Sequence, residues 1–218
     1  MGEIIDIRSR RGRGAPERER QDGGTIFRIR LCGAQRQEIE AAGRAIGRAF
    51  ILEGFYIAFE NWEESLLPTC TLRAGREVVT ERGGERCPGL VVAADSRTLS
   101  RATLRGCNQT TVLLAHGDPR VEPMRGLGFV GTVVPLPIAV LQLDPFGLAA
   151  ACAGGAARLL GAIRWTALEQ GLREEFAGLD QAAVNRLLAM ALEAFDRTAP
   201  WAGQVTAVRE ELEELPGG

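Results

Sequence analysis

The side chains best suited to acid–base or nucleophilic chemistry surround His116, the single histidine of the chain. Asp118 follows it closely, and Asp95 ends an apolar run upstream, so both carboxylates could flank the imidazole at neighbouring strand ends. Cys107 precedes His116 and would supply a thiol nucleophile. The chain has no Gly-x-Ser-x-Gly motif that would position a serine nucleophile. The alternative, which we favour, is a histidine in a polar loop after a strand.

Nucleotide binding by the turn around Gly33 is a second possible chemistry. A Gly-x-Gly-x-x-Gly fingerprint starting there would need glycines where Gln35 and Glu38 stand. Glu60 follows an apolar run, in the place of an acid that binds a ribose. However, Glu38 and Glu40 put negative charge at the start of the next helix, which stabilises the helix and repels a phosphate. We therefore predict that this turn does not bind a dinucleotide.

The composition excludes several other classes of protein. All 26 basic residues are arginine, so Schiff-base, pyridoxal and P-loop lysine chemistry is excluded. The five cysteines have neither Cys-x-x-Cys nor ferredoxin spacing, which predicts free thiols and no metal or iron–sulfur cluster in this chain. A net charge of −2 gives no general attraction to nucleic acid. No apolar run predicts a membrane span, and we expect a cytoplasmic protein.

The sequence predicts alternating strands and helices, which would position the candidate side chains around His116 and Gly33. Residues Ile26–Leu31 alternate apolar and charged, Ile39–Leu52 have a helical apolar face, and Phe55–Phe59 form a second strand. This βαβ opening is expected to cross over right-handed into a parallel sheet. Further strands are predicted at 70–73, 77–79 (a hairpin return), 89–95, 110–115 and 129–136. A helical turn or short helix is predicted at 96–104. Further helices are predicted at 148–163, 166–176 (after a Thr166/Glu169 capping box), 181–196 (after an Asp180 N-cap) and 205–215. The predicted fold is α/β: an open, mainly parallel twisted sheet flanked by helices, Rossmann-like, with a C-terminal helical segment.

The turn after the first strand carries a family resemblance. It reads Cys-Gly-Ala-Gln-Arg-Gln-Glu-Ile-Glu-Ala-Ala-Gly from residue 32 to 43. The chain resembles the gamma subunit, or gamma domain, of the thiamine-diphosphate-dependent 2-oxoacid:ferredoxin oxidoreductases, in which this turn is glycine-rich. Matches to the family are Gly33, Gln37, Ile39, Ala42 and Gly43, and Phe50–Ile57 is similar to the stretch that follows. Cys32, Gln35, Arg36 and Glu38 replace family glycines, and Asp144-Pro145-Phe146 lacks the arginine of the family's Asn-Pro-Arg stretch. The resemblance therefore indicates a divergent member.

The resemblance implies a subunit that holds no cofactor itself. In the family, alpha and beta chains carry thiamine diphosphate with Mg²⁺, a delta or ferredoxin-like subunit or domain carries [4Fe-4S] clusters, and coenzyme A is a substrate. The complex decarboxylates a 2-oxoacid to an acyl-CoA and reduces ferredoxin. We expect this chain to contribute no catalytic residue. We expect an interface with partner subunits at the loop after the second strand, formed by Trp62, Glu63, Glu64, Leu66 and Leu67.

Three segments are predicted: a flexible basic arm at 1–24, an α/β gamma-type domain at 25–200 and an acidic C-terminal helix or tail at 201–218. The arm is arginine-rich but lacks aromatic residues that would stack on bases, so we expect no nucleic-acid partner. The alternatives are a degenerate, purely structural paralogue in a redox complex, a stand-alone nucleotide-binding α/β protein, and a nucleic-acid binder acting through the arm.

Overall fold

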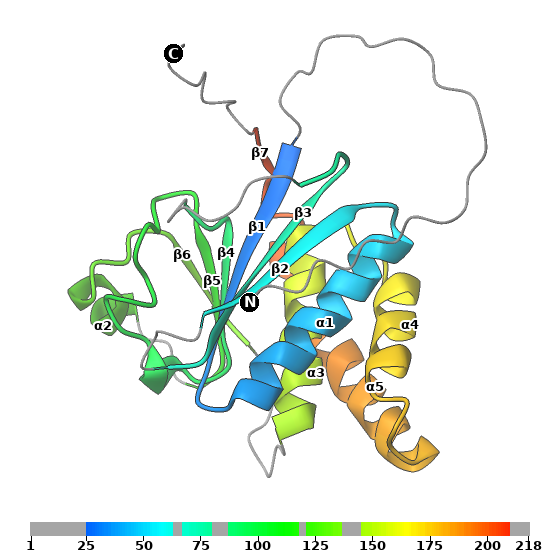
Figure 1. Cartoon of the computed structure of the whole chain (residues 1–218). Helices are drawn as coiled ribbons and strands as arrows, with labels where there is room; N and C mark the ends of the chain where they lie inside the picture. Colours follow the sequence, from blue (N-terminus) through cyan, green and yellow to red (C-terminus); the bar gives the residue numbers. More distant parts are fainter. Residues whose placement is uncertain (1–24, 63–66, 80–86, 118–120, 137–144, 210–218) are drawn as a thin grey trace, which may run out of the picture.

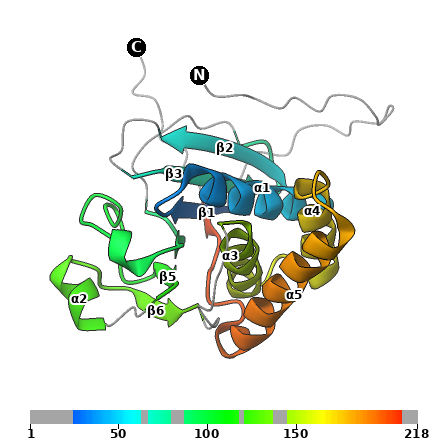
Figure 2. The same ribbon diagram turned by 90° about the horizontal axis from the view of Figure 1, so that it is seen from below.

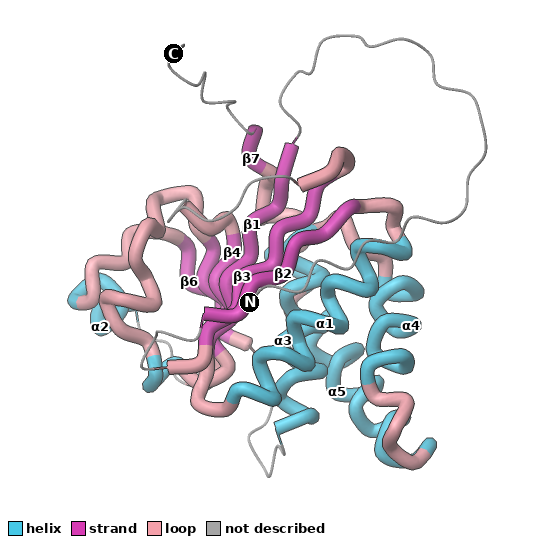
Figure 3. Tube along the Cα trace, in the orientation of Figure 1, coloured by secondary structure: helices cyan, strands magenta, loops and turns pink. Residues whose placement is uncertain are grey.

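A computed structural model describes residues 25–62, 67–79, 87–117, 121–136 and 145–209. Its strands form one sheet in the order β2-β3-β1-β4-β5-β6, and β7 pairs with β1 (Figures 1 and 3). The predicted arm and the acidic residues 210–218 lie outside the described residues. The strands are β1 (Thr25–Cys32), β2 (Tyr56–Trp62), β3 (Thr69–Gly75), β4 (Leu90–Ala93), β5 (Val112–Ala115), β6 (Thr132–Pro135) and β7 (Val208–Arg209). The helices are α1 (Arg36–Leu52), α2 (Val121–Gly126), α3 (Pro145–Leu160), α4 (Trp165–Glu175) and α5 (Gln181–Arg197), with short 3₁₀ helices η1 (Ser96–Thr98) and η2 (Ala199–Trp201).

The sheet is mixed, with a parallel half and an antiparallel half. Strands β1, β4, β5 and β6 pair in parallel. Strand β3 runs antiparallel to both β1 and β2 and lies between them. The predicted open α/β fold is thus confirmed, and β1 and β2 do run in the same direction. The two strands of the βαβ opening do not pair with each other, because β3 lies between them.

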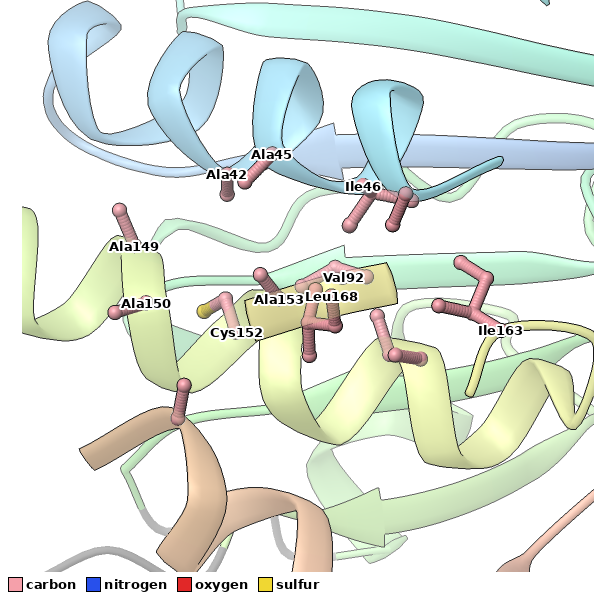
Figure 4. Close-up of a cluster of buried hydrophobic side chains, with 14 of the residues drawn as sticks. Ala42, Ala45, Ile46, Val92, Ala149, Ala150, Cys152, Ala153, Ile163 and Leu168 are labelled. Atoms are coloured by element: carbon pink, nitrogen blue, oxygen red, sulfur yellow. The ribbon is translucent and has the colours of Figure 1, made fainter. Parts of the chain in front are cut away.

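Four helices lie on one side of the sheet, and α2 lies with the β4–β5 connection on the other (Figures 1 and 2). Helices α1 and α3 meet through small residues: Ala42 and Ala45 of α1 face the alanine-rich stretch of α3 (Figure 4). These side chains are buried. A Cβ atom at Gly154 of α3 would overlap the backbone of Ala191, so α5 packs directly against α3. Small residues therefore allow three helices to pack within one core.

The opposite face of β4 and β5 has its own apolar cluster. Val91 and Leu113 are fully buried there, under Leu104 of the β4–β5 connection and Phe129 after α2. On β1 the same face carries arginines instead. The Arg30 guanidinium donates to the carbonyl of Thr103 at 3.0 Å and to that of Arg105 at 2.7 Å. The alternation that predicted β1 thus places the charged Arg30 side chain against the β4–β5 connection.

Helix ends show which local signals were correct. Asp180 caps α5 as predicted, accepting from the Ala183 N–H at 2.7 Å. The capping box predicted at Thr166 is wrong, because α4 begins one residue earlier and its N-cap is Arg164. The Glu53 carboxylate, from the residue after α1, accepts from the Arg164 backbone N–H at 3.1 Å and from its side-chain Nε at 2.9 Å. Glu53, which is distant in the sequence, thus provides the hydrogen bond at the start of α4 that a local capping side chain was expected to provide.

Two predicted elements differ in the structure. The hairpin return predicted at residues 77–79 is not a strand, because both edges of β3 already pair with β1 and β2. The helix predicted from Val205 is wrong for its described part, since Val208 and Arg209 are extended and pair with Ile26 and Thr25. Val205 is buried and its N–H donates to Leu159, which ties this segment to the same core.

Candidate functional site

The turn between β1 and α1 is packed against the end of β4 at Gly33. A Cβ atom on Gly33 would lie 2.9 Å from the Cβ atom of Ala94 and 3.3 Å from Oε2 of Glu38. The Ala94 N–H also donates to the carbonyl of Cys32 at 2.9 Å. Because no side chain fits here, the family glycine at Gly33 is explained by packing of the turn.

Gly43 allows α1 to lie close to the antiparallel half of the sheet. A Cβ atom there would lie 2.5 Å from a ring carbon of Phe59 in β2 and 3.2 Å from Sγ of Cys70 in β3. Gln37, the third family remnant, is exposed on the first turn of α1. The two glycines therefore keep a structural role that requires no ligand.

Glu38 occupies the amino end of α1 from the inside of the protein. The residue is only 5% exposed, and the N–H of the N-cap residue Gln35 hydrogen-bonds its carboxylate. Burial raises the pKa of Glu38 to about 7, while the Gln35 hydrogen bond lowers it and the charge of Asp95 raises it. The first turn of α1 thus has an internal acid where a nucleotide-binding helix receives a phosphate.

Glu40, the second acid expected to repel a phosphate, lies on the outer side of α1. It is half-buried, 3.4 Å from the Arg44 guanidinium and 4.0 Å from that of Arg36. Its charge is therefore partly balanced along the helix. Of the two acids, Glu38 is the one positioned to exclude an anion. The Gln35-x-x-Glu38 spacing, with an acid at the third helical residue, was the available signal for this inward carboxylate.

Glu60 lies away from the position of a ribose-binding acid. In a dinucleotide fold the strand after the first helix lies beside the first strand, whereas here β3 intervenes. The Arg73 guanidinium of β3 donates to Oε1 of Glu60 at 2.5 Å. Glu60 is therefore one half of a cross-strand ion pair, which sequence reasoning missed because nothing local places β3 beside β2.

Asp95 and His116 do meet at the carboxyl ends of β4 and β5. The His116 N–H donates to Ala93, and the His116 carbonyl accepts from Ser96, at 3.0 and 2.9 Å. The residue is buried, its Nδ1 has no hydrogen-bond partner in the described structure, and burial lowers its pKa. Asp95 instead binds the Arg97 side chain at 2.8–3.1 Å and caps η1, which lowers the pKa of Asp95.

The rest of the candidate triad is not assembled around His116. Cys107 precedes β5 whereas His116 follows it, so the thiol lies at the opposite edge of the sheet. Asp118 lies outside the described residues. A carboxylate held by Arg97 and a buried imidazole without a thiol beside it do not form a nucleophilic site.

The predicted interface loop joins β2 to β3. The Trp62 backbone ends β2 and pairs with Thr69 of β3. Leu67 is half-buried, and its carbonyl accepts from the Thr69 hydroxyl at 3.2 Å. Glu63, Glu64 and Leu66 lie outside the described residues. The two strands that flank the loop pair antiparallel, and the outer one, β2, ends the sheet order.

The cysteines are free thiols, with Cys32, Cys70 and Cys152 buried in the interior. Burial raises the pKa of Cys32 to about 12 and also raises those of Cys70 and Cys152. Within the described ranges, no three histidine, cysteine or acidic side chains are grouped so as to hold a metal ion. Nor does any described helix have the length and apolar character needed to cross a membrane.

Comparison with known proteins finds similarity of structure. No protein-family model matches the chain, and no curated protein matches its sequence. The structure is similar to pyruvate oxidoreductase subunit PORC from Thermotoga maritima, with a TM-score of 0.63 and 20% identity over 79% of this chain and 96% of that one. It is also similar to the keto/oxoacid ferredoxin oxidoreductase gamma subunit from Geobacter sulfurreducens, with a TM-score of 0.59 and 14% identity over 80% and 99% of the two chains. This chain has the fold of those subunits.

A third similar structure is a longer chain. The 2-oxoglutarate:ferredoxin oxidoreductase from Magnetococcus marinus, solved with 2-oxoglutarate, coenzyme A and succinyl-CoA bound, gives a TM-score of 0.59 at 16% identity. The similarity covers 85% of this chain but 32% of that one. The gamma-type resemblance read from the sequence is thus confirmed at the level of the fold.

Proposed function

We propose that the chain is a gamma-type subunit of a multisubunit 2-oxoacid:acceptor oxidoreductase and does not itself bind thiamine diphosphate. The main support for this proposal is that the similarity of fold covers nearly the full length of two such subunits. The described residues also lack an assembled catalytic set, since Cys107 lies apart from His116 and Asp95 is held by Arg97. This combination suits a chain that supports a reaction carried out by its partners.

In this proposal the reactive groups belong to other chains. Alpha and beta chains would hold thiamine diphosphate with Mg²⁺, and a delta or ferredoxin-like subunit would hold the [4Fe-4S] clusters. The complex would convert a 2-oxoacid and coenzyme A to an acyl-CoA while reducing ferredoxin. The role of this chain would be to assemble and close the active-site region without a cofactor of its own.

The second candidate is a purely structural paralogue within such a redox complex. It is favoured by Glu38, whose buried carboxylate takes the amino end of α1. If the family turn contributes to activity through its glycines, this chain has lost that contribution and retains only the scaffold. The two candidates differ in whether the assembled complex depends on this turn for turnover.

The test is to purify the complex anaerobically through a tag on this chain and to assay it with 2-oxoacids, coenzyme A and a viologen dye. Co-purification of thiamine-diphosphate-containing chains with coenzyme A-dependent dye reduction would support the gamma-type role. Assembly of those chains without dependence of turnover on residues 33–38 would support the structural paralogue. A chain that purifies alone with bound flavin or thiamine diphosphate would contradict both.

The β1–α1 turn gives a direct binding prediction. Isothermal titration of the purified chain with NAD, NADP, FAD and coenzyme A should show no dissociation constant below roughly 1 mM, equivalent to about 4 kcal/mol. The reason is that the Glu38 carboxyl already occupies the α1 terminus where a phosphate would bind. A micromolar constant that is lost in Gly33→Val would contradict the prediction.

For the interface at Trp62, Glu63, Glu64, Leu66 and Leu67, we predict that Trp62→Ala weakens assembly by roughly 2 kcal/mol or more, as expected for an aromatic interface anchor. The melting temperature of the isolated chain should change little. Assembly is measured by biolayer interferometry against the partner chains, with the exposed Tyr56→Ala at the other end of β2 as the matched control. Normal assembly by a destabilised Trp62→Ala chain would show that Trp62 belongs to the core.

A further inference from the structure

Two thiols meet at one hydroxyl at the amino ends of β4 and β5. The Cys87 Sγ lies 3.4 Å from Oγ1 of Thr111, and the Cys107 side chain forms a hydrogen bond with the same hydroxyl. Thr111 is fully buried, and its hydroxyl also donates to the carbonyl of Pro88 at 2.8 Å and accepts from the Asn108 N–H at 3.0 Å. The oxygen is therefore fixed, and both thiols contact it from neighbouring segments.

These two cysteines differ from the other three in their access to solvent. Cys87 and Cys107 are half-buried, whereas Cys32, Cys70 and Cys152 are buried. Both segments are also anchored: the Gly89 N–H, two residues after Cys87, donates to the Arg28 carbonyl at 2.9 Å, and the Cys107 N–H donates to the Leu104 carbonyl at 3.2 Å. A small oxidant can therefore reach this pair, whose two thiols contact the same hydroxyl.

From this arrangement we propose that Cys87 and Cys107 form a reversible dithiol–disulfide pair that links the entry of β4 to the β4–β5 connection. The inference is independent of the proposed oxidoreductase role. The bond would close the segment from 87 to 107, which contains β4 and η1. It would lock the parallel half of the sheet at the edge opposite Asp95 and His116.

The chemistry is thiol–disulfide exchange with a low-molecular-weight disulfide such as oxidised glutathione. The Cys87 thiolate attacks one glutathione sulfur, forming a mixed disulfide and releasing one glutathione thiolate. The Cys107 thiolate then attacks the Cys87 sulfur, breaking the mixed disulfide and releasing the second glutathione. One dithiol is oxidised and one glutathione disulfide is reduced to two thiols.

Cys107 is assigned the second, resolving step because of its surroundings. Burial raises the pKa of the Cys107 thiol to about 11, although the charge of Arg30 lowers it and that of Cys87 raises it. A thiol with a raised pKa is a slow first nucleophile but reacts readily once a mixed disulfide is held beside it.

The test treats the full chain with oxidised glutathione and counts thiols by alkylation after denaturation. The expected count falls from five to three, because one bond consumes two of the five cysteines. Peptide mapping should find the Cys87–Cys107 link, and dithiothreitol should reverse it. Cys107→Ser should stop at a stable mixed disulfide on Cys87, whereas Cys152→Ala, the matched control in the buried α3, should still form the link.

A thiol count that stays at five in a glutathione titration would overturn the proposal. Links between molecules, or links spread over the buried cysteines, would overturn it as well. The wild-type peptide map decides the matter even if a variant folds poorly. A raised melting temperature of the oxidised chain, lost on reduction, would further support an intramolecular lock.

Discussion

Replacing Gly154 with alanine should cost roughly 3 kcal/mol of unfolding free energy, because the added methyl group has no space against the backbone of α5. It would overlap the carbonyl oxygen of Ala191 and lie 2.8 Å from the carbonyl carbon. Backbone atoms cannot rotate away as a side chain can, so α3 and α5 must separate. For a chain of this size we expect the melting temperature to fall by about 10 °C, measured by calorimetry.

Gly178→Ala is the matched control for that substitution. Gly178 lies between α4 and α5, and a Cβ atom there would meet nothing within 4 Å. Its melting temperature should stay close to that of the wild type. If Gly154→Ala and Gly178→Ala have the same melting temperature, the inference that α5 packs directly on the backbone of α3 is wrong.

The wild-type protein should become less stable as pH rises through the titration of Glu38. Replacing Glu38 with glutamine should abolish this pH dependence. The folded-state pKa of Glu38, about 7, lies above its ordinary value of 4.5 because the carboxyl is buried. The folded protein therefore binds this proton more tightly than the unfolded chain, and stability falls between about pH 4.5 and 7. Glutamine stays neutral throughout. The rise of the pKa from 4.5 to about 7 corresponds to roughly 3 kcal/mol at about 1.4 kcal/mol per pKa unit, and solvent screening reduces the expected gain of Glu38→Gln at pH 8 to roughly 2 kcal/mol.

The measurement is urea unfolding of both proteins from pH 5 to 8. His116 contributes a slope of opposite sign, since burial lowers its pKa, so the difference between the two proteins is the informative quantity. Asp95 and Glu53, whose pKa values are lowered by Arg97 and Arg164, change stability at more acidic pH. Glu40→Gln, on the outer side of α1, is the control. Parallel pH profiles for wild type and Glu38→Gln would show that folding does not raise the pKa of Glu38.

The elements of the fold followed from periodicity and local signals. The alternation in β1 and the helical stripe of α5 were sufficient, because each pattern reports which side of an element faces the core. The short helix α2 and the two-residue β7 were missed, since neither is long enough to show a period. The Thr166 capping box failed because Glu53, far away in the sequence, supplies the partner for Arg164.

The candidate site was predicted less completely than the fold. The sequence showed that Gln35 and Glu38 replace family glycines, and the structure adds that Glu38 is buried and bonded to the N–H of Gln35. The meeting of Asp95 with His116 followed from the rule that parallel strands end at one edge. The pairing of Glu60 with Arg73 could not be anticipated, because nothing local places β3 between β1 and β2.

The sequence by itself determined that this is an α/β chain with gamma-type resemblance and an altered first turn, because those properties lie in local patterns of residue type. Tertiary structure alone decided that the sheet is mixed, that Cys107 and His116 lie at opposite edges, and that Cys87 and Cys107 share the Thr111 hydroxyl. The physical reason is that strand order and side-chain pairing depend on contacts between segments distant in the chain. Such contacts are chosen by the packing of the whole core and leave no periodic trace in any one segment.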